Sequence, residues 1–544
     1  MLYLFCLLIM MIPVFLGFGS IFQWIFGQWF TGLASKLITG VFSAAVLFTL
    51  LAFFFPLSIY LEIGALAVGL TAFFWFKSYR ELWVFLAESE VWFFLIAAVT
   101  VFFASYYPFI LDHFGYYVPT VKWISEVGLV RGISNLDLIL GQMSVWHGLQ
   151  AGFSNFSDPF LRINTVVMLT WLIYIFERKG WIHLFFFPVL YLFLQSPSPD
   201  LPAIALSLII LNEILQRNTN PGIIFTLSVF VFAVKPTMIW LPVFVLLHQI
   251  FMLRSNLRVL LPGMVLLFLF LFKGIWTFGY PVFPVQVFDF NVPWKPNPEL
   301  LRNSSQMALQ KTYDMQFTPA EIAQFSTFDR IKNWLFLDGI KGRIHLFFIL
   351  SLFAFFVYAF MQKSRTVWLL FSAILFKSIL VLLFSAQYRF FLDVFFVVFF
   401  VLLYQKWTRQ NSLLGFSVSA LVLGVLLSFP NVLKTIFPSF RLGDFMTGFS
   451  NSQFYKPAYF ELRKFKTYKV GNLTFNVVQD YPFSFDTPLP AISPQFIQED
   501  LDAGIFPQLK GKTLKDGFVW RPLTDSEKMQ LQKILDDWAA GNHD

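Results

Sequence analysis

The sequence predicts an all-α, polytopic transmembrane protein with about 14 spans and no large soluble domain. Hydrophobic residues make up 57% of the 544 positions and charged residues only 13%, which is about half the charged fraction of an average soluble domain. The 75 phenylalanines exceed what a water-soluble core can bury, whereas helices that face acyl chains accept this side chain freely. The composition therefore excludes a typical soluble enzyme.

The individual elements follow from apolar runs near the length of about 20 residues that crosses a bilayer. The run at 2–26 has no basic n-region and no small-residue cleavage site, so it predicts a retained helix and not a signal peptide. The predicted spans are 2–26, 37–57, 59–76, 90–107, 161–176, 182–196, 201–216, 222–234, 237–253, 257–275, 344–361, 366–385, 389–405 and 412–429. They define a transmembrane domain at 1–430 and a tail at 431–544.

Lysine and arginine in the short loops predict the orientation of these spans. Basic residues recur at alternate ends of successive spans, as they do in cytoplasmic loops: Lys77, Arg80, Arg178, Lys179, Arg217, Arg254, Arg258, Lys363, Arg365, Lys406 and Arg409. This topology places four segments on the face opposite the basic loops: a first outer loop (108–160), the turn 196–200, a second outer loop (276–343) and the tail. The net charge of +8 is then explained by contact with anionic membrane lipids and requires no nucleic-acid partner.

The outer segments carry amphipathic and capping patterns. Apolar residues at helical spacing over 118–128 and 136–149, with Trp123 and Trp146, predict two helices that lie in the membrane surface. Thr318 with Glu321, and Thr524 with Glu527, have the spacing of capping boxes. The second box begins a short soluble helix whose apolar stripe is expected to pack on its own tail. The single cysteine, Cys6, excludes an internal disulfide and any cysteine-based metal site.

Several segments together carry a family resemblance. They are DHFGYYVPTVKWISEVGLVRGISNL (112–136), SPSPDLP before a span, KGIWTFGYPVFPVQVFDFNVPW (273–294), AQYRFFLDVF (386–395), and DTPLP followed by LKDGFVW in the tail. Their order resembles the GT-C superfamily of membrane glycosyltransferases, and more closely a poorly characterised group of bacterial multi-span proteins of that architecture. The resemblance implies a bacterial inner-membrane enzyme that transfers a sugar from a polyprenyl-phosphate carrier on the periplasmic face, where the tail also lies.

The chain departs from the GT-C pattern in its first outer loop. GT-C enzymes often carry two adjacent acids there, whereas Asp112 is followed here by His113. The resemblance implies that the loop aspartate is a catalytic base or a metal ligand, and this departure favours a metal-independent site over a metal-dependent one. No cofactor is expected, because the sequence has no phosphate-binding loop and no glycine-rich dinucleotide loop.

Asp112 is the candidate catalytic base, and His113 beside it is a candidate substrate-binding residue. Apolar surroundings next to a membrane helix are expected to raise the pKa of Asp112 toward the working range of a base. Two structural alternatives remain open, because Asp112 would serve equally well as a cap for the helix that begins near Val118 or as an ion-pair partner of Lys122.

Four further residues on the outer side are candidates for binding the substrate. Arg389 lies where the positive-inside rule does not explain it, so it is either a phosphate ligand or an interfacial anchor. Lys235 and Lys273 carry the same two interpretations. Asp200, after two prolines, is either a site residue or, more simply, a helix N-cap.

Two charges lie deeper in predicted spans. Buried intramembrane charges are usually paired, which predicts a contact between Lys377 and Asp393. The same pair in a proton or ion pathway would suit a transporter or lipid flippase. A non-catalytic scaffold subunit that binds other membrane proteins is the stronger alternative to an enzyme, since the abundant phenylalanine and the reduced acidic motif both suit it.

Overall fold

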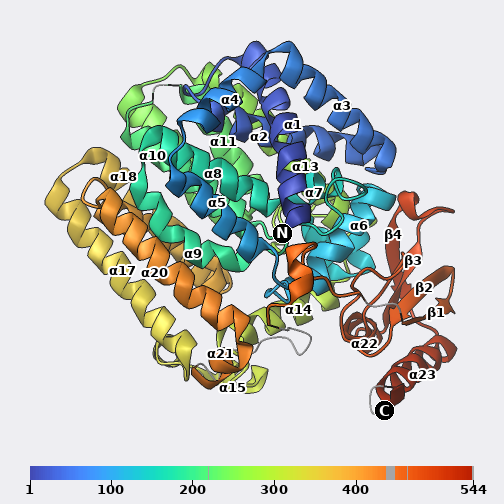
Figure 1. The fold of residues 1–544 in the computed structure, drawn as a ribbon. Coiled ribbons are helices and arrows are strands. Elements are labelled where there is room, and N and C mark those ends of the chain that lie inside the picture. Colours follow the sequence, from blue (N-terminus) through green and yellow to red (C-terminus); the bar gives the residue numbers. More distant parts are fainter. Residues whose placement is uncertain (219, 437–447, 462–463, 542–544) are drawn as a thin grey trace.

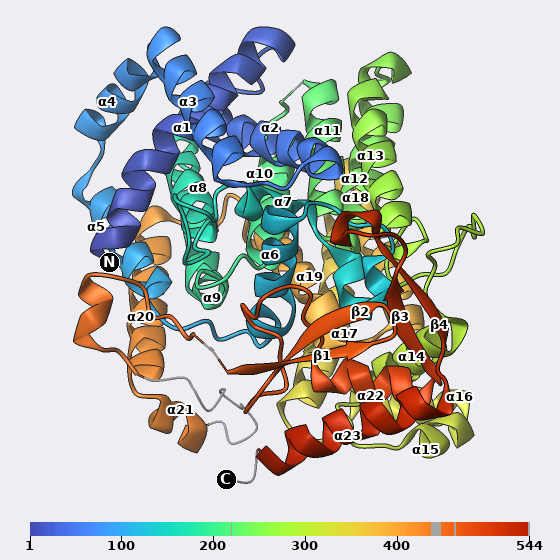
Figure 2. The ribbon, with the colours of Figure 1, turned by 90° about the vertical axis from the view of Figure 1, so that its right-hand side faces the viewer.

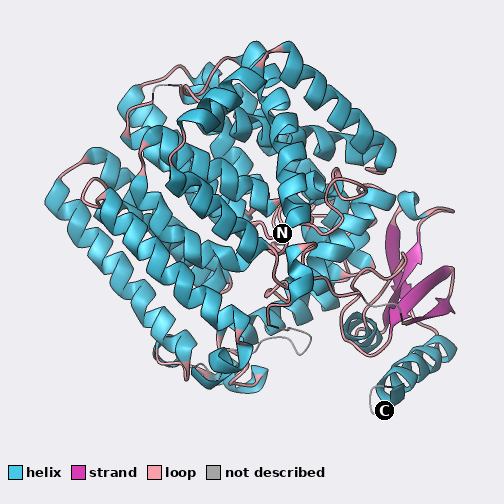
Figure 3. Cartoon of the chain, in the orientation of Figure 1, coloured by secondary structure: helices cyan, strands magenta, loops and turns pink. Residues whose placement is uncertain are grey.

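The computed structural model describes residues 1–218, 220–436, 448–461 and 464–541. Within them the chain is mostly helical, and the named strands all lie in the C-terminal tail (Figure 3). Seven helices are long and apolar enough to cross a membrane. Their bounds are Leu2–Phe26, Leu33–Phe54, Pro236–Leu253, Leu257–Phe278, Ile340–Gln362, Arg365–Phe384 and Arg409–Ser428. The bent pair Ile59–Trp75 and Ser78–Glu88 makes an eighth if it counts as one span.

The predicted number of spans is not confirmed, because several predicted spans are short helices. Val91–Ala104, Pro221–Val234 and Leu392–Leu403 have 12 to 14 residues. At a rise of about 1.5 Å per residue such helices reach only about 18 to 21 Å, less than the hydrocarbon core of about 30 Å. The region predicted as a span at 182–196 consists of short helical pieces around α9 (Phe187–Leu190).

The N-terminal helices form one group (Figure 1), in which the first helix approaches the second and the third at backbone contact. They are α1 (Leu2–Phe26), α2 (Leu33–Phe54), α3 (Ile59–Trp75), α4 (Ser78–Glu88) and α5 (Val91–Ala104). A Cβ atom added to Gly17 on α1 would lie 1.8 Å from the carbonyl oxygen of Gly69 on α3. Only glycine permits so close an approach, which is the usual way in which small residues bring membrane helices together.

The first outer loop is folded into the protein interior. It contains α6 (Val118–Glu126) and α7 (Val145–Ala151). The prediction that these amphipathic segments lie in the membrane surface is wrong, since Trp123 is 1% exposed and Trp146 is fully buried. Their apolar faces pack on other parts of the chain: α7 packs on α2, and α6 packs on α7. An amphipathic pattern demands an apolar partner, and here that partner is protein.

The remaining helices follow in chain order. The central set is α8 (Asn164–Arg178), α10 (Asp200–Leu215), α11 (Pro221–Val234), α12 (Trp240–His248) and α13 (Leu261–Phe278). The second outer loop holds α14 (Pro298–Thr312), α15 (Pro319–Gln324) and α16 (Thr327–Leu335). The chain then forms α17 (Ile340–Gln362), α18 (Arg365–Phe384), α19 (Leu392–Leu403), α20 (Arg409–Ser428) and α21 (Pro430–Ile436), of which α17, α18 and α20 lie along one side of the molecule (Figure 1).

The tail contains two antiparallel hairpins beside two helices, so the all-α prediction is wrong for this part. The strands are β1 (Phe465–Val470), β2 (Leu473–Val478), β3 (Ile505–Leu509) and β4 (Phe518–Pro522), and the helices are α22 (Pro494–Asp502) and α23 (Asp525–Gly541) (Figure 2). The sequence signal for the first hairpin was present: a two-residue Gly471–Asn472 turn, with Gly471 at φ +60°, between segments rich in β-branched and aromatic residues.

Both predicted capping boxes are confirmed. Thr318 and Glu321 exchange hydrogen bonds at the start of α15, and Thr524 and Glu527 do so before α23. The stripe of α23 is buried as expected, with Leu531 fully buried and Ile534 3% exposed. Helix α23 packs on α22 of the same tail.

The loops separate into two ends of the bundle. At the basic end, Glu177 accepts hydrogen bonds from Leu33 and Ala34, and Arg178 pairs with Glu213. At the other end, called the site end, Arg162 binds the segments around 106, 195 and 458, and Asp112 ties the first outer loop to the segment around 389. The loops around Arg178 and Arg217, two of those predicted to share one face, thus lie in contact.

Candidate functional site

The first predicted residue of the site, Asp112, forms an ion pair with Arg389. Their Oδ2 and Nη1 atoms are 3.1 Å apart, and the side chains are 29% and 49% exposed. Asp112 directly precedes a five-residue π-helix, His113–Tyr117, and Arg389 lies in the 3₁₀ turn Tyr388–Phe390 before α19. A carboxylate and a guanidinium from distant parts of the chain therefore meet at the site end, where solvent reaches both.

Asp200 and Lys235 form a second ion pair beside the first. Asp200 is the first residue of α10, and Lys235 follows the last residue of α11. Their side chains are 15% and 16% exposed and in direct hydrogen-bonding contact. The hydroxyl of Ser198 donates a hydrogen bond of 3.1 Å to the other oxygen of Asp200. This pair is the less accessible of the two.

Tyr117 connects the two ion pairs. Tyr117 is 3% exposed, and its side chain lies close to Ser198, whose hydroxyl donates a hydrogen bond to Asp200. Burial raises the pKa of Tyr117 well above its usual value, and the charges of Asp112 and Asp200 raise it further, so the phenol stays protonated. Although burial acts to lower it, the pKa of Arg389 is raised above its usual range by Asp112, Tyr117, Asp200 and Tyr388.

A third pair continues the same series into the helix bundle. Lys377 of α18 and Asp393 of α19 are 2.5 Å apart and almost completely buried, which confirms the predicted contact. Trp240 at the start of α12 donates a hydrogen bond of 2.8 Å to the second oxygen of Asp393. Lys235 lies close enough to Lys377 for the two positive charges to repel each other, so the second and third pairs are neighbours. Exposure thus falls from the first pair to the third, so the series is accessible from the site end.

The structure does not bring His113 and Lys273 to these pairs. His113 is 5% exposed and packs edge-on against Phe114. Burial, together with the charge of Arg162, lowers its pKa well below 6.5, so the ring is neutral. Lys273 is 2% exposed, and its ammonium donates to the carbonyl oxygens of Met143 (2.5 Å) and Gln142 (3.4 Å). Lys273 therefore fixes the first outer loop on α13, and it is no interfacial anchor.

The simpler alternatives for the two acids are also settled by their contacts. Asp112 is not a helix cap, because its side chain makes no capping bond. It is not the ion-pair partner of Lys122 either, because Lys122 contacts Glu126 and the carbonyl oxygen of Asp486. Asp200 makes no capping bond either, which makes the favoured N-cap interpretation wrong. A carboxylate in the first turn is still stabilised by the helix dipole, but its direct partner is Lys235.

Two residues that sequence reasoning missed hold the site segments in place. Arg162, 1% exposed, donates to the carbonyl oxygens of Tyr106, Gln195 and Ala458. Asn164 donates to the carbonyl oxygens of Phe193, Ser196 and Ser198. Arg162 lies just before α8, at the opposite end from the basic Arg178, and an unexplained charge in such a position was the available signal. The backbone carbonyls they bind are not recognisable in a sequence.

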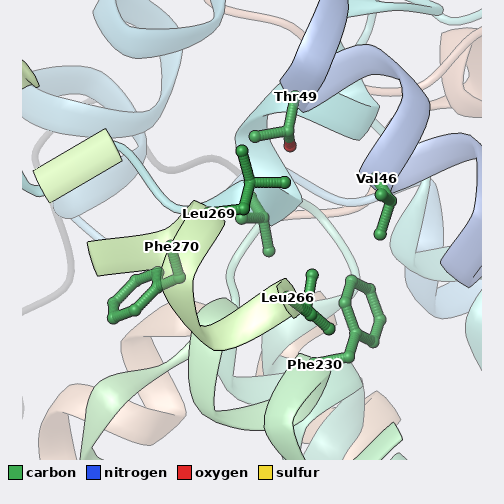
Figure 4. A pocket seen from close by; sticks show the side chains of 7 residues that line it. Val46, Thr49, Phe230, Leu266, Leu269 and Phe270 are labelled. Atoms are coloured by element: carbon green, nitrogen blue, oxygen red, sulfur yellow. The ribbon is translucent and has the colours of Figure 1, made fainter. Parts of the chain in front are cut away.

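A small internal cavity lies between α2, α7, α11 and α13. It is lined by Val46, Thr49, Val145, Phe230, Leu266, Leu269 and Phe270 and measures only about 10 Å³ (Figure 4), about the space of one water. Across the described ranges, no three His, Cys, Asp or Glu side chains are grouped closely enough to hold a metal ion.

Comparison with known families covers most of the chain. The family model described as "Domain of unknown function (DUF8201)" matches residues 1–396. The chain belongs to this family. The matched region includes all three ion pairs, while α20 and the tail lie beyond it. No curated protein and no solved structure matches the chain.

Proposed function

We propose that this protein is a GT-C-like glycosyltransferase that moves a sugar from a polyprenyl-phosphate carrier to an acceptor. The site end would face the periplasm of a bacterial inner membrane. The observation that carries the proposal is the convergence of four predicted residues, Asp112, Asp200, Lys235 and Arg389, at one end of a helical bundle. They supply a solvent-accessible carboxylate and cations, which are the two kinds of group that glycosyl transfer from a phosphate requires.

The proposed reaction is one displacement. Asp112 accepts the proton of the acceptor hydroxyl, and the acceptor oxygen forms a bond to C1 of the sugar. The bond between C1 and the phosphate oxygen breaks, and its electron pair stays on the departing polyprenyl phosphate. Arg389 binds this phosphate by charge-assisted hydrogen bonds. For this to happen the guanidinium must exchange Asp112 for phosphate, which the 49% exposure of Arg389 permits.

The second ion pair and Tyr117 act as supports in this mechanism. Asp200 lies near enough to Arg389 to interact with its charge, so it holds the guanidinium when Asp112 releases it. Lys235 neutralises Asp200. Tyr117 is buried and held protonated between the acids, so it separates the two carboxylates without adding a charge of its own.

The test is sugar transfer in proteoliposomes containing a panel of polyprenyl-phosphate sugars. Asp112→Asn should reduce turnover about 10²- to 10⁴-fold, the usual contribution of a general base. Arg389→Ala should also lose retained polyprenyl phosphate in native mass spectrometry. Asp480→Asn is the matched control, since it removes a carboxylate from an exposed ion pair with Lys464 in the tail. An Asp112→Asn protein that is folded and fully active would end the assignment of the base.

A scaffold subunit is the second candidate. The observation that favours it is that Asp112 with Arg389, and Asp200 with Lys235, already satisfy each other without any ligand. Purification in mild detergent separates the two proposals. Stoichiometric partner subunits without bound polyprenyl phosphate would favour the scaffold.

A further inference from the structure

A second region with the form of a ligand site lies at the end of α13. A cavity of about 580 Å³ lies between this helix and the loop 281–290, within the range of about 300–1,000 Å³ usual for ligand pockets. All ten side chains that line it are apolar. Phe268, Phe272 and Ile275 come from the helix, and the loop contributes Val282, Val285 and Phe288 among others.

Two glycines allow the loop to form this cavity. Gly279 ends α13 in a left-handed conformation (φ 90°) and turns the chain back. A Cβ on Gly274 would lie 2.1 Å from the carbonyl oxygen of Pro281, so only glycine lets the returning loop rest on the helix. An antiparallel bridge between Val282 and Val285 shapes the loop beyond this contact.

The cavity adjoins the lipid-facing stripe of α13. Leu261, Val265 and Phe268 follow each other along one face of this helix and are 64%, 62% and 71% exposed. The helix belongs to a candidate span, Leu257–Phe278, so its exposed apolar face contacts acyl chains. A hydrocarbon chain can therefore pass from the bilayer along this stripe into the cavity without meeting a polar group.

Two cations lie just beyond the cavity. The Arg131 guanidinium is 4.2 Å from the ring centroid of Trp276, whose ring is 5.8 Å from that of Phe272 in the cavity wall. Lys510 of the tail is 5.0 Å from the ring centroid of Trp294, which Arg131 also approaches at 5.9 Å. Among the residues that the structure describes, neither cation has a carboxylate within 4 Å, although Asp516 is close enough to Arg131 for their charges to interact. Tryptophan and basic residues at the end of a span mark the level of lipid headgroups.

We propose that this region, Arg131 and Lys510 together with the cavity beneath Trp276, binds one anionic phospholipid. The hydrocarbon chain occupies the cavity, and the phosphate is held by Arg131 and Lys510. The bound lipid joins the membrane domain to the tail, because Arg131 belongs to the first outer loop and Lys510 to the segment after β3. The inference does not depend on glycosyl transfer, since it uses none of the residues of the three ion pairs.

The test is native mass spectrometry of the full chain, purified in mild detergent and supplied with phosphatidylglycerol or phosphatidylcholine. We expect one phosphatidylglycerol per protein, and little phosphatidylcholine. Arg131→Gln should lower its occupancy about tenfold, which is the loss expected from one charged hydrogen bond, and Arg131→Lys should retain most of it. Phe268→Ala/Phe272→Ala should also lower occupancy.

Matched controls distinguish this site from other lipid contacts. Lys512→Gln removes a nearby exposed cation, and Phe353→Ala/Phe360→Ala removes two exposed rings from α17; both should leave occupancy unchanged, as should Arg389→Ala. Size-exclusion elution and circular dichroism check folding. Equal retention in all variants, loss only in Arg389→Ala, or displacement by millimolar inorganic phosphate would each overturn the proposal. The last result would identify the ligand as a soluble anion.

Discussion

Replacing Lys377 by methionine tests the buried ion pair of α18 and α19. Methionine keeps the length of the side chain and removes its charge. Asp393 is then left 5% exposed with Trp240 as its remaining hydrogen-bond donor. Removing one partner of a buried pair typically costs about 3–5 kcal/mol, because the other charge stays buried and uncompensated. We expect a loss of unfolding free energy of that size.

The double variant Lys377→Met/Asp393→Leu should be more stable than Lys377→Met alone. It removes both charges, and the remaining penalty is the unpaired indole of Trp240, worth about 1–3 kcal/mol. The assay is reversible unfolding in mixed micelles titrated with sodium dodecyl sulfate, followed by circular dichroism. Lys363→Met, at an exposed helix end, is the control and should stay within about 0.5 kcal/mol of the wild type.

Two results would refute this reasoning. If Lys377→Met is as stable as Lys363→Met, the lysine is not paired inside the protein. If the double variant loses the sum of the free energies lost by Lys377→Met and by Asp393→Leu, each measured alone, the two side chains do not interact.

Three further predictions follow from groups outside the spans. Arg162→Ala should destabilise the protein by about 3–5 kcal/mol, because three buried carbonyl groups lose their donor. The control is Arg302→Ala, which removes an exposed arginine. Equal melting temperatures of the two variants would contradict the prediction. Burial raises the pKa of Asp158 from 3.8 to about 7; the folded state therefore binds the proton more tightly, and stability should fall by up to about 4 kcal/mol as pH rises from 4 to 7. Asp158→Asn should flatten that dependence in melts between pH 4 and 8, and an unchanged slope would show that another group is responsible. Thr524→Ala should remove the cap of α23 and lower the free energy of opening of its first turn, measured by amide hydrogen exchange, by about 1 kcal/mol. Thr435→Ala on α21 is the control and should leave exchange in α23 unchanged.

Local patterns in the sequence were sufficient for the class of the protein and for short-range elements. The apolar runs predicted a helical membrane protein, although they did not separate helices that are long enough to cross from the short ones. The boxes at Thr318 and Thr524 were predictable because a capping box is complete within four residues. The pair of Lys377 and Asp393 was predictable because two charges in successive spans have few other partners in an apolar bundle.

Tertiary structure alone decided the partners at the site and the surroundings of the amphipathic helices. Asp112 and Arg389 were each recognised as candidates, but their contact depends on how the first outer loop packs against the start of α19. The stripes of Trp123 and Trp146 required an apolar partner without specifying whether it is lipid or protein, and the packed structure supplies protein. The physical reason is the same in both cases: side-chain periodicity reports that a surface must be buried or a charge compensated, and the identity of the partner depends on which segments the whole chain brings together.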